Sequence, residues 1–338
     1  MTSQRTITPE DADRTYRDGI ARSAELIQAW TGPVVIVGHV DPDGDAIGSV
    51  VGLGRALRRL GKDVTLPIEA PRFLHFMADE GELSPPLTTL ASGTLAIVLD
   101  SDLERSVGAP LDAAARTLNL DHHGTNPGDA DLAVIAPHKA AAALMVKDLV
   151  DELGLAWDER LATPVLMGLV SDTGTFRFGN TDRDVLCAAG DLIATGLPYA
   201  ELIDRLRWRH PDHYRMLAMV LATVRFDEGG AVVSVRQTAE MRERLGPTDD
   251  DSSDFVNVVR DAEGTLVAFF LREIDDGVKV SIRSRPGVSA QAICVALGGG
   301  GHVAAAGATL RGVDVDAAYA RVMAATRLEL ARATPNVG

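Results

Sequence analysis

The sequence predicts an α/β protein of two domains, in which a parallel sheet flanked by helices precedes a smaller α/β domain. The chain has 338 residues, which is more than one domain usually holds. Short apolar runs alternate with segments of helical character in its first part, and such alternation is typical of a parallel sheet. Strand and helix signals mix again near the C-terminus, which indicates a second, smaller domain.

The first domain is expected to begin with a helix and to continue through five strands. Thr8-Pro9-Glu10-Asp11 combines a capping residue, a proline at the first helical position and acids in the first turn, so a helix should run to about Trp30. A second helix over 46–60 should stop at Gly61. Residues 140–221 have a mainly helical pattern. The predicted strands are the apolar runs at 34–37, 64–68, 95–99, 117–120 and 132–135.

The second domain is expected to mix strands and helices. Asp276-Gly277 lies between two apolar runs and signals a hairpin turn. The domains are placed at residues 1–208 and 229–338, with a linker helix region at 209–228, and residues 246–254 are expected to form a mobile loop. The predicted strands are 231–235, 266–271 and 278–283, and the predicted helices are 238–245, 289–297 and 313–331.

Composition narrows the classes of function. The net charge of −15 argues against a protein that coats long nucleic acid, because such binding needs broad neutralisation of phosphates. A short nucleotide remains possible, since a metal ion and a few arginines can hold one or two phosphates. Cys187 and Cys294 lie in apolar, helical contexts and are expected to be buried thiols. With no apolar leader and no apolar run of membrane-spanning length, the chain is expected to be cytoplasmic and free of membranes.

Carboxylate and imidazole side chains follow three predicted strands and one predicted helix. Because the carboxyl ends of parallel strands meet at one edge of a sheet, these side chains can converge. Each group could also be ordinary: an Asp/Gly-rich turn, a strand-end cap or a surface turn. Four unrelated turns or caps with these residue types, each at the end of a strand or helix, are less plausible than one shared functional site. The residues are His39, Asp43, Asp45, Asp100, Asp121, His122, His123 and Asp172.

Such a cluster of carboxylates would repel itself strongly without cations. Carboxylate and imidazole ligands without thiolate favour Mn²⁺ over a structural zinc ion, and Mg²⁺ is less suited to imidazole. Two divalent ions roughly 3.5–4 Å apart are the usual arrangement for in-line phosphoryl displacement. The residue types therefore indicate a two-metal centre that acts on phosphate.

The motifs of this chain resemble those of a known family. His39-x-x-x-Asp43-x-Asp45-x-x-Gly48-Ser49, Asp100, Asp121-His122-His123 and Asp172 are similar, in order, to the four motifs of the DHH phosphoesterase superfamily. The glycine run 298–301 with His302 and Ala306-Gly307 resembles the signature of its DHHA1 domain. The resemblance spans nearly the whole chain. It is nearest to the two-domain nanoRNase (oligoribonuclease) and pAp phosphatase type, some members of which also cleave cyclic-di-AMP or pApA.

The resemblance implies a role for each residue of the cluster. It gives one Mn²⁺ to His39, Asp43 and Asp100, and the other to Asp45, Asp100, His122 and Asp172, so that Asp100 bridges the two ions. Spacing alone leaves this division open. Asp121 would orient a histidine from outside the ligand set. His123 would donate to a phosphate oxygen or help to protonate the leaving group. Asp41 is not a ligand in the family.

The second domain is expected to bind the substrate across a cleft. Glycines allow backbone N–H groups to approach an anion, and arginine suits bidentate contact with phosphate. A plain turn and solvated arginines, including Arg285, are the alternative. The resulting clamp would favour small nucleotides with a terminal phosphate. The expected substrate-binding residues are Arg283, Ser284, Gly300, Gly301 and His302.

Three other features are open to two interpretations. Arg205, Arg207 and Arg209 could face a nucleotide, but a solvated helix face is favoured. One ring of Phe176-Arg177-Phe178 could stack on a base or pack in the core. His138-Lys139, followed by four alanines, replaces the hydroxyl and acidic residues that the family places after its third motif. Contacts to base and sugar are therefore harder to transfer from the family.

The sequence thus predicts a Mn²⁺-dependent phosphohydrolase in which a metal-bridging hydroxide attacks phosphorus in line. The resemblance implies pApA, other nanoRNAs, pAp and cyclic-di-AMP as candidate substrates, 5′-mononucleotides as products, and a homodimer. Alternatives are a manganese inorganic pyrophosphatase, against which the glycine-rich C-terminal signature argues, and a RecJ-type exonuclease, which is usually longer. A metal-dependent nucleotide sensor is the non-enzymatic alternative.

Overall fold

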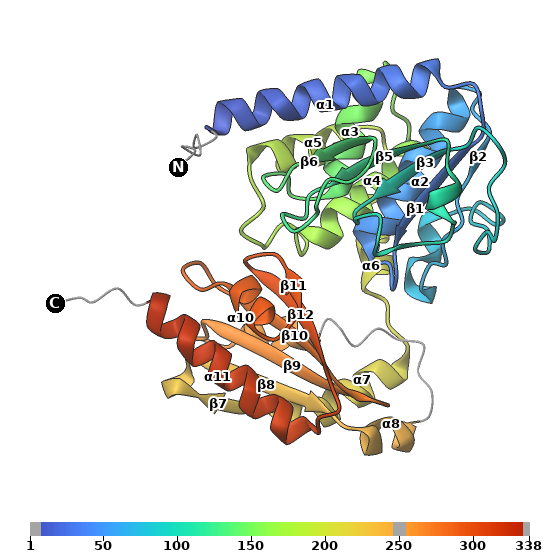
Figure 1. Ribbon diagram of the computed structural model, residues 1–338. Helices are drawn as coiled ribbons and strands as arrows, with labels where there is room; N and C mark the ends of the chain where they lie inside the picture. Colours follow the sequence, from blue (N-terminus) through green and yellow to red (C-terminus); the bar gives the residue numbers. More distant parts are fainter. Residues whose placement is uncertain (1–7, 246–254, 334–338) are drawn as a thin grey trace. The chain divides into compact units, whose positions relative to one another are not determined.

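The computed structural model describes residues 8–245 and 255–333 and divides the chain into two compact units, Met1–Trp208 and Arg209–Gly338 (Figure 1). Residues 209–228, which we expected to link the domains, are part of the second unit and include α7 (Pro211–Leu221) and β7 (Arg225–Asp227). The expected mobile loop at 246–254 lies outside the described residues.

The first unit contains the parallel sheet that the sequence predicts, and the strand order is β2-β1-β3-β5-β6. The short β4 (Ser106–Val107) pairs antiparallel with the end of β1. Only two residues of the run at 64–68 pair, and Pro67, which has no N–H to donate to a ladder, follows shortly after them. The parallel strands are β1 (Val34–His39), β2 (Val64–Thr65), β3 (Leu95–Leu99), β5 (Arg116–Asp121) and β6 (Leu132–Ile135).

The helices of the first unit share one face of this sheet. Val34 and Ile36 belong to the main core, which includes side chains from the helices, whereas Val35 and Val37 face a smaller core closed by loop residues between 87 and 114. The helices therefore flank the sheet on one side, and a loop segment covers the other. The helices are α1 (Pro9–Ala29), α2 (Gly44–Arg59), α3 (Ala142–Glu152), α4 (Glu159–Asp172), α5 (Arg183–Ile193) and α6 (Tyr199–Arg207).

A row of glycines lets α2 approach α4 closely. A Cβ at Gly48 would lie 2.4 Å from the carbonyl oxygen of Pro164, and a Cβ at Gly52 would lie 2.4 Å from Cγ2 of Val165. A Cβ at Gly44 would lie 2.6 Å from the side chain of Ser171. These distances are shorter than van der Waals contact, so any larger residue would push the two helices apart. The contact fixes the helices that carry two parts of the acidic cluster.

Arg55 on α2 compensates for a proline within α4. Pro164 has no N–H to donate to the carbonyl of Arg160 one turn earlier. The buried guanidinium of Arg55 donates to that carbonyl at 2.6 Å and forms a bidentate pair with Glu82, with its closest contact at 2.7 Å. The orphaned carbonyl is therefore satisfied by a side chain of the neighbouring helix, which adds a polar tie to the glycine contact.

The second unit contains a sheet in the order β11-β12-β10-β9-β8-β7 (Figure 1). Its neighbours pair antiparallel except β8 with β9, which are parallel. The predicted hairpin joins β9 to β10; its turn residues are Asp275 and Asp276, one position earlier than the predicted pair, and Gly277 is the first residue of β10 and pairs with Ile274. The strands not yet given are β8 (Val232–Gln237), β9 (Val267–Ile274), β10 (Gly277–Ser284), β11 (Gly300–Gly301) and β12 (Ala305–Arg311).

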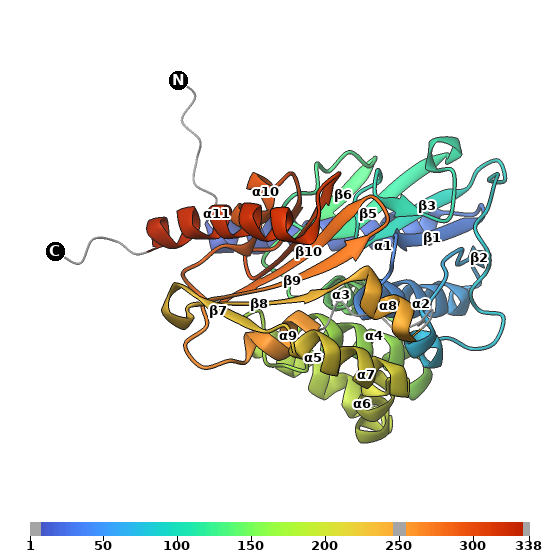
Figure 2. The ribbon, with the colours of Figure 1, turned by 90° about the horizontal axis from the view of Figure 1, so that it is seen from below.

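Helices cover both faces of this second sheet (Figures 1 and 2). α10 (Ala290–Ala296) and α11 (Val315–Ala333) contribute to one core, and α7 and α9 (Phe255–Arg260) contribute to the core on the other face. The predicted helix at 238–245 is α8 (Ala239–Leu245). The pattern misses β12 because its alternating residues are alanine and glycine, which carry a weak strand signal.

Two further expectations have different outcomes. Cys294 is buried in α10, but Cys187 is exposed on α5, so the prediction of two buried thiols is wrong for Cys187. Its helix is amphipathic, and Cys187 occupies the outer side, while Val185 and Ala188 face the core. Among residues 8–245 and 255–333, no helix combines the length and the apolar character needed to cross a membrane.

Candidate metal centre

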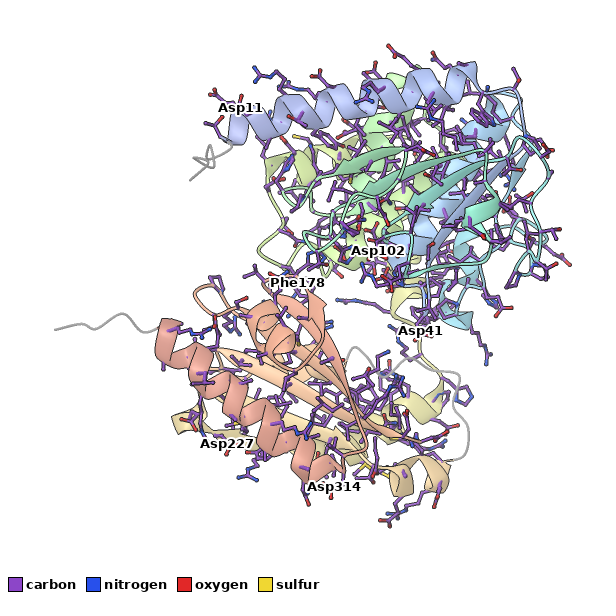
Figure 3. The ribbon with its side chains drawn as sticks, viewed as in Figure 1. Asp11, Asp41, Asp102, Phe178, Asp227 and Asp314 are labelled. Atoms are coloured by element: carbon purple, nitrogen blue, oxygen red, sulfur yellow. The ribbon has the colours of Figure 1, made fainter. Side chains whose placement is uncertain are left out.

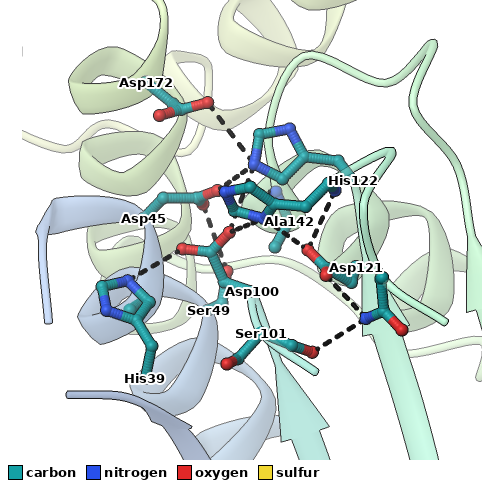
Figure 4. Close-up of polar contacts among 12 residues, drawn as sticks. His39, Asp45, Ser49, Asp100, Ser101, Asp121, His122, Ala142 and Asp172 are labelled. Atoms are coloured by element: carbon teal, nitrogen blue, oxygen red, sulfur yellow. Dashed lines mark hydrogen bonds and ion pairs between the residues drawn. The ribbon is translucent and has the colours of Figure 1, made fainter. Parts of the chain in front are cut away.

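The polar ends of three strands and two helices of the first unit meet at one edge of its sheet (Figure 4). β1 ends at His39, β5 ends at Asp121, and Asp100 directly follows β3. Asp43 caps α2, and Asp172 is the last residue of α4. The structure thus brings together all the strand-end and helix-end residues that the sequence singles out in this domain.

Asp100 lies at the middle of the cluster. Its Oδ2 is 3.5 Å from Nε2 of His39, and its Oδ1 is 3.2 Å from Nε2 of His122 and 3.6 Å from Nδ1 of His123. The backbone of Asp100 has a φ of +57°, an uncommon conformation for a residue with a side chain. A carboxylate that faces three imidazoles in a strained backbone conformation is typical of a functional site.

Asp45 supplies a cap that α3 lacks from its own sequence. The capping position of α3 is Ala141, whose side chain cannot accept a hydrogen bond. Instead, Oδ2 of Asp45 accepts from the N–H of Ala142 at 2.6 Å, and its Oδ1 accepts from the N–H of Ala143 at 2.8 Å. Ser49 Oγ donates to the same carboxylate at 3.3 Å. Asp45 is therefore held rigidly, and it joins α2 to α3.

Backbone carbonyls orient two of the imidazoles. Nδ1 of His39 lies 2.8 Å from the carbonyl of Val40, and Nδ1 of His122 lies 3.3 Å from the carbonyl of Lys139. Each contact favours the tautomer with the proton on Nδ1, which leaves Nε2 as the nitrogen that faces the carboxylates. Sequence reasoning missed the roles of Lys139 and Ala142, because a backbone group can come from any residue type.

The remaining members complete two groups. Nε2 of His122 lies 3.6 Å from Oδ2 of Asp172 and 3.7 Å from Oδ2 of Asp45. Nε2 of His39 lies 4.0 Å from Oδ1 of Asp43, and this oxygen also accepts from two backbone N–H groups at the start of α2. The donor atoms of His39, Asp43 and Asp100 cluster together, and so do those of Asp45, His122 and Asp172.

Asp121 and His123 form a separate pair beside the cluster. Nδ1 of His123 donates to Oδ1 of the buried Asp121 at 2.7 Å, and the backbone N–H of His123 donates to the same oxygen at 3.1 Å. Burial opposes ionisation of Asp121, but the contact with His123 outweighs it and lowers the pKa of Asp121. Asp121 is thus a carboxylate that holds His123 by Nδ1.

The cluster has strongly perturbed pKa values. Burial raises the pKa of Asp45 well above its usual value, and it raises the pKa of Asp172 to about 6 although His122 opposes the change. Burial disfavours ionised Asp100, but contacts with His122 and His39 hold its pKa well below the usual range. Burial lowers the pKa of His39, yet the contact with Asp100 outweighs burial and raises it to about 10.

These observations fit divalent cations. Oδ1 of Asp100 is buried and has no hydrogen-bond partner among the described residues, although two imidazoles lie near it. Burial and mutual repulsion disfavour the ionised carboxylates, and a cation would remove that penalty. The donors are carboxylate oxygens and imidazole nitrogens oriented by backbone groups, a set that suits Mn²⁺. Asp41, which the resemblance excludes, lies in the loop after β1 with a φ of +52° (Figure 3).

In the second unit, the expected substrate-binding residues lie at the end of β10 and in the β11–β12 hairpin. Arg283 Nε donates to Oδ1 of Asn257 at 3.0 Å. Ser284 is buried, and its hydroxyl donates to the carbonyl of Val303 at 2.9 Å, so it supports the loop that carries His302.

The glycines of the hairpin differ in their surroundings. A Cβ at Gly299 would lie 2.1 Å from the carbonyl oxygen of Gly307, and a Cβ at Gly301 would lie 2.7 Å from Cα of Ala306. Both glycines are therefore required by the close packing of β11 on β12. A Cβ at Gly300 would have nothing within 4 Å in the described structure, so packing does not explain that glycine.

Some of the residues with two interpretations have contacts within their own unit. Nε of Arg285 donates to the carbonyl of Thr265 at 2.8 Å. Arg205 pairs with Glu201 at 3.3 Å on an exposed face of α6. The ring of Phe178 lies against Gly174, which has a φ of +57°.

Comparison with known proteins supports this architecture. The DHH family, N-terminal domain, matches residues 33–169, and the DHHA1 domain matches residues 227–327. The chain is 51% identical, over 94% of its length and 96% of the relative's, to the bifunctional oligoribonuclease and PAP phosphatase NrnA of Thermus thermophilus. It is 28% identical to the protein of the same name from Bacillus subtilis, over 83% of this chain and 90% of that protein.

A solved structure has the same fold. An exopolyphosphatase-related protein from Bacteroides fragilis superposes with a TM-score of 0.83, covers 94% of this chain and 98% of its own, and is 22% identical. At that identity the likeness concerns the fold alone. The two matched domains and the 51% identical relative are decisive, and the chain belongs to the DHH/DHHA1 phosphoesterase superfamily.

Proposed function

We propose that this chain is a Mn²⁺-dependent hydrolase of short nucleotides with a terminal phosphate, and that it releases 5′-mononucleotides. The observation that carries this proposal is the 51% identity, across almost the full length of both chains, to a relative named as a bifunctional oligoribonuclease and PAP phosphatase. The net charge of −15 agrees with a small substrate, because a long nucleic acid would need many basic contacts.

The proposed site contains two Mn²⁺ ions. One set of ligands is His39, Asp43 and Asp100, and the other is Asp45, Asp100, His122 and Asp172. The grouping of donor atoms and the orphaned oxygen of Asp100 support this assignment. When bound, the two ions supply an acidified water and neutralise charge on the phosphoryl oxygens.

The chain's own residues would orient the groups around the reacting phosphate. Asp45 is fixed by two amides of α3, so its carboxylate keeps one direction. His123 is fixed at Nδ1 by Asp121, so its Nε2 is the nitrogen that would reach the substrate. There it would donate to a phosphoryl oxygen or pass its proton to the leaving oxygen as the P–O bond breaks. Geometry of this kind contributes through orientation and electrostatic stabilisation.

We propose that the second unit holds the terminal phosphate through Arg283, Gly300, Gly301 and His302. Gly300→Ala tests this with little effect on folding, because the added Cβ has nothing within 4 Å. The melting temperature should stay near that of the wild type while KM for pAp rises. An unchanged KM would contradict the clamp. Gly299→Ala is the contrasting variant: its Cβ would overlap a backbone oxygen, so it should lower stability.

The decisive experiment is one assay in Mn²⁺ that compares pAp, pApA, cyclic-di-AMP, a five-nucleotide RNA, a long single-stranded DNA and pyrophosphate. We expect pAp and pApA to be hydrolysed and pyrophosphate to be inert. Preference for pyrophosphate would indicate a pyrophosphatase, and preference for the long strand would indicate an exonuclease. Binding without product would indicate a sensor. Asp100→Asn is the control and should abolish turnover.

We also propose a homodimer, which the family resemblance implies. Size-exclusion chromatography with light scattering measures the mass directly. A mass near 36 kDa, that of one chain, would refute this part of the proposal.

A further inference from the structure

Two asparagines lie directly behind the Asp121–His123 pair. Asn126 closes the turn that begins at His123, because its backbone N–H donates to the carbonyl of His123 at 3.1 Å. Its side-chain Oδ1 accepts from the N–H of Gly128 at 2.9 Å, so its Nδ2 must face the other way. There Nδ2 donates to Oδ2 of Asp121 at 2.7 Å and to Oδ1 of Asn119 at 2.8 Å, and it also contacts the carbonyl of Ser101 at 3.2 Å.

Asn119 fixes the far end of this arrangement. It is fully buried in β5, and its Nδ2 donates to the carbonyl of Val98 at 3.0 Å and to the carbonyl of Ser101 at 2.8 Å. With both donors used, its Oδ1 is the acceptor that meets Asn126. The two amides therefore have one mutually consistent orientation. Buried chains of this kind hold their members more rigidly than separate hydrogen bonds do.

The chain of hydrogen bonds ends on Asp121. Asn126 donates to its Oδ2, while Nδ1 and the backbone N–H of His123 donate to its Oδ1. Without Asn126, Oδ2 would be left buried and unsatisfied, and the carboxylate could rotate. Rotation would break the hydrogen bond to Nδ1 of His123, so the orientation of the imidazole ring would no longer be fixed. Asn119 also donates to the carbonyl of Ser101, which directly follows Asp100. The same series of hydrogen bonds therefore supports the loop at the centre of the cluster.

We infer that Asn126, supported by Asn119, is a positioning residue for His123: it locks Asp121 so that His123 keeps its proton on Nδ1 and presents Nε2 to the substrate. The inference rests on the proposed function, in which His123 acts on the phosphate or the leaving oxygen. It predicts that Asn126 affects turnover through His123, because the carbonyl of Ser101 beside Asp100 is also held by Asn119 and keeps that bond when Asn126 is replaced.

A double-mutant cycle tests this dependence. Turnover of pApA in Mn²⁺ is measured for the wild type, Asn126→Ala, His123→Ala and the double variant. Asn126→Ala should lower kcat about 10- to 100-fold, as supporting residues of a site commonly do, with a small change in KM. In the His123→Ala background the same substitution should cost less than about twofold. Equal losses in both backgrounds would overturn the inference.

A matched control uses a second asparagine near the cluster. Asn180 Nδ2 donates to two backbone carbonyls, those of Ala140 and Asp172, each at 3.1 Å, and these bonds involve neither Asp121 nor His123. Asn180→Ala should therefore combine additively with His123→Ala. Should Asn126→Ala fail to fold, Asn126→Ser takes its place in the cycle, because the shorter hydroxyl cannot span the distance to Asp121. Unchanged Mn²⁺ binding by titration calorimetry confirms that the ligand set is intact.

An NMR measurement gives a readout that needs no substrate. In metal-free protein labelled with ¹⁵N histidine, the proton on Nδ1 of His123 should give a downfield signal that His123→Ala removes. Asn126→Ala should shift or broaden this signal, and Asn180→Ala should not. A signal unchanged in Asn126→Ala would overturn the inference. Absence of hydrolysis by the wild type, with the NMR effect present, would refute the proposed function alone.

Discussion

Replacing Gly48 with alanine should separate two helices that carry parts of the proposed metal centre. The new Cβ would lie 2.4 Å from the carbonyl oxygen of Pro164 and 2.9 Å from the backbone nitrogen of Gly168. Both atoms belong to the backbone of α4, so no side chain can rotate away. Because Cβ atoms do not approach closer than 3.0 Å, α2 and α4 must move apart by roughly 0.6 Å.

This displacement should cost stability and metal affinity together. Overpacking of a core typically costs about 1–3 kcal/mol, which corresponds to a melting temperature roughly 2–12 °C lower for a unit of this size. Asp45 on α2 and Asp172 on α4 would also move relative to each other, so Mn²⁺ affinity should fall about 10- to 100-fold, as it does when the supports of metal ligands are altered. Calorimetry measures both quantities.

Gly190→Ala is the matched control. Gly190 is an exposed residue of α5, and a Cβ there would have nothing within 4 Å. Alanine should therefore stabilise the helix by about 0.5–1 kcal/mol and leave Mn²⁺ affinity unchanged. If Gly48→Ala melts and binds Mn²⁺ as the wild type does, the reasoning from close helix packing is refuted.

Three further outcomes are expected. Arg55→Met should destabilise the protein by roughly 1–3 kcal/mol in urea unfolding, because the carbonyl of Arg160 loses its donor while Glu82 keeps Arg58 as a partner, and a loss below 1 kcal/mol would contradict this. A thiol reagent at pH 8 should titrate Cys187 alone in the native protein and both thiols in denaturant, since burial raises the pKa of Cys294 to about 12; fast labelling of two native thiols would refute it. Mn²⁺ at a hundredfold excess over Kd should stabilise the wild type by about 2.7 kcal/mol, and Asp100→Asn should remove most of this gain in thermal unfolding.

The ends of the strands were predictable from the sequence because the apolar runs stop directly before polar candidate site residues. Leu95–Leu99 is a strand with the predicted bounds, and Asp100 follows it as expected. The pattern also predicts that the sheet of the first domain is parallel, although no α-helix separates β3, β5 and β6 along the chain. The strand Ala305–Arg311 was not predicted, because most of its residues are alanine or glycine and show little alternation between large apolar and polar side chains.

The supports of the site could not be predicted in the same way. Ala142 and Ala143 act through backbone N–H groups, which every residue except proline carries, so their sequence holds no sign of the contact with Asp45. Ser284 was expected among the substrate-binding residues at the end of a strand, and the structure shows its hydroxyl buried and donating to the carbonyl of Val303. Which side of a strand faces outward depends on the register of pairing, and local composition does not determine that register.

The cap that Asp45 gives to α3 means that protein contacts alone fix the direction of one carboxylate of the proposed metal centre. Three protein donors already hold this carboxylate, so it cannot swing to follow cations of different radius. A cation must then match a spacing set by the packing of α2 against its neighbours, and selection among metals becomes a matter of fit to a rigid frame. The same frame would let a stripped enzyme regain its ions without refolding.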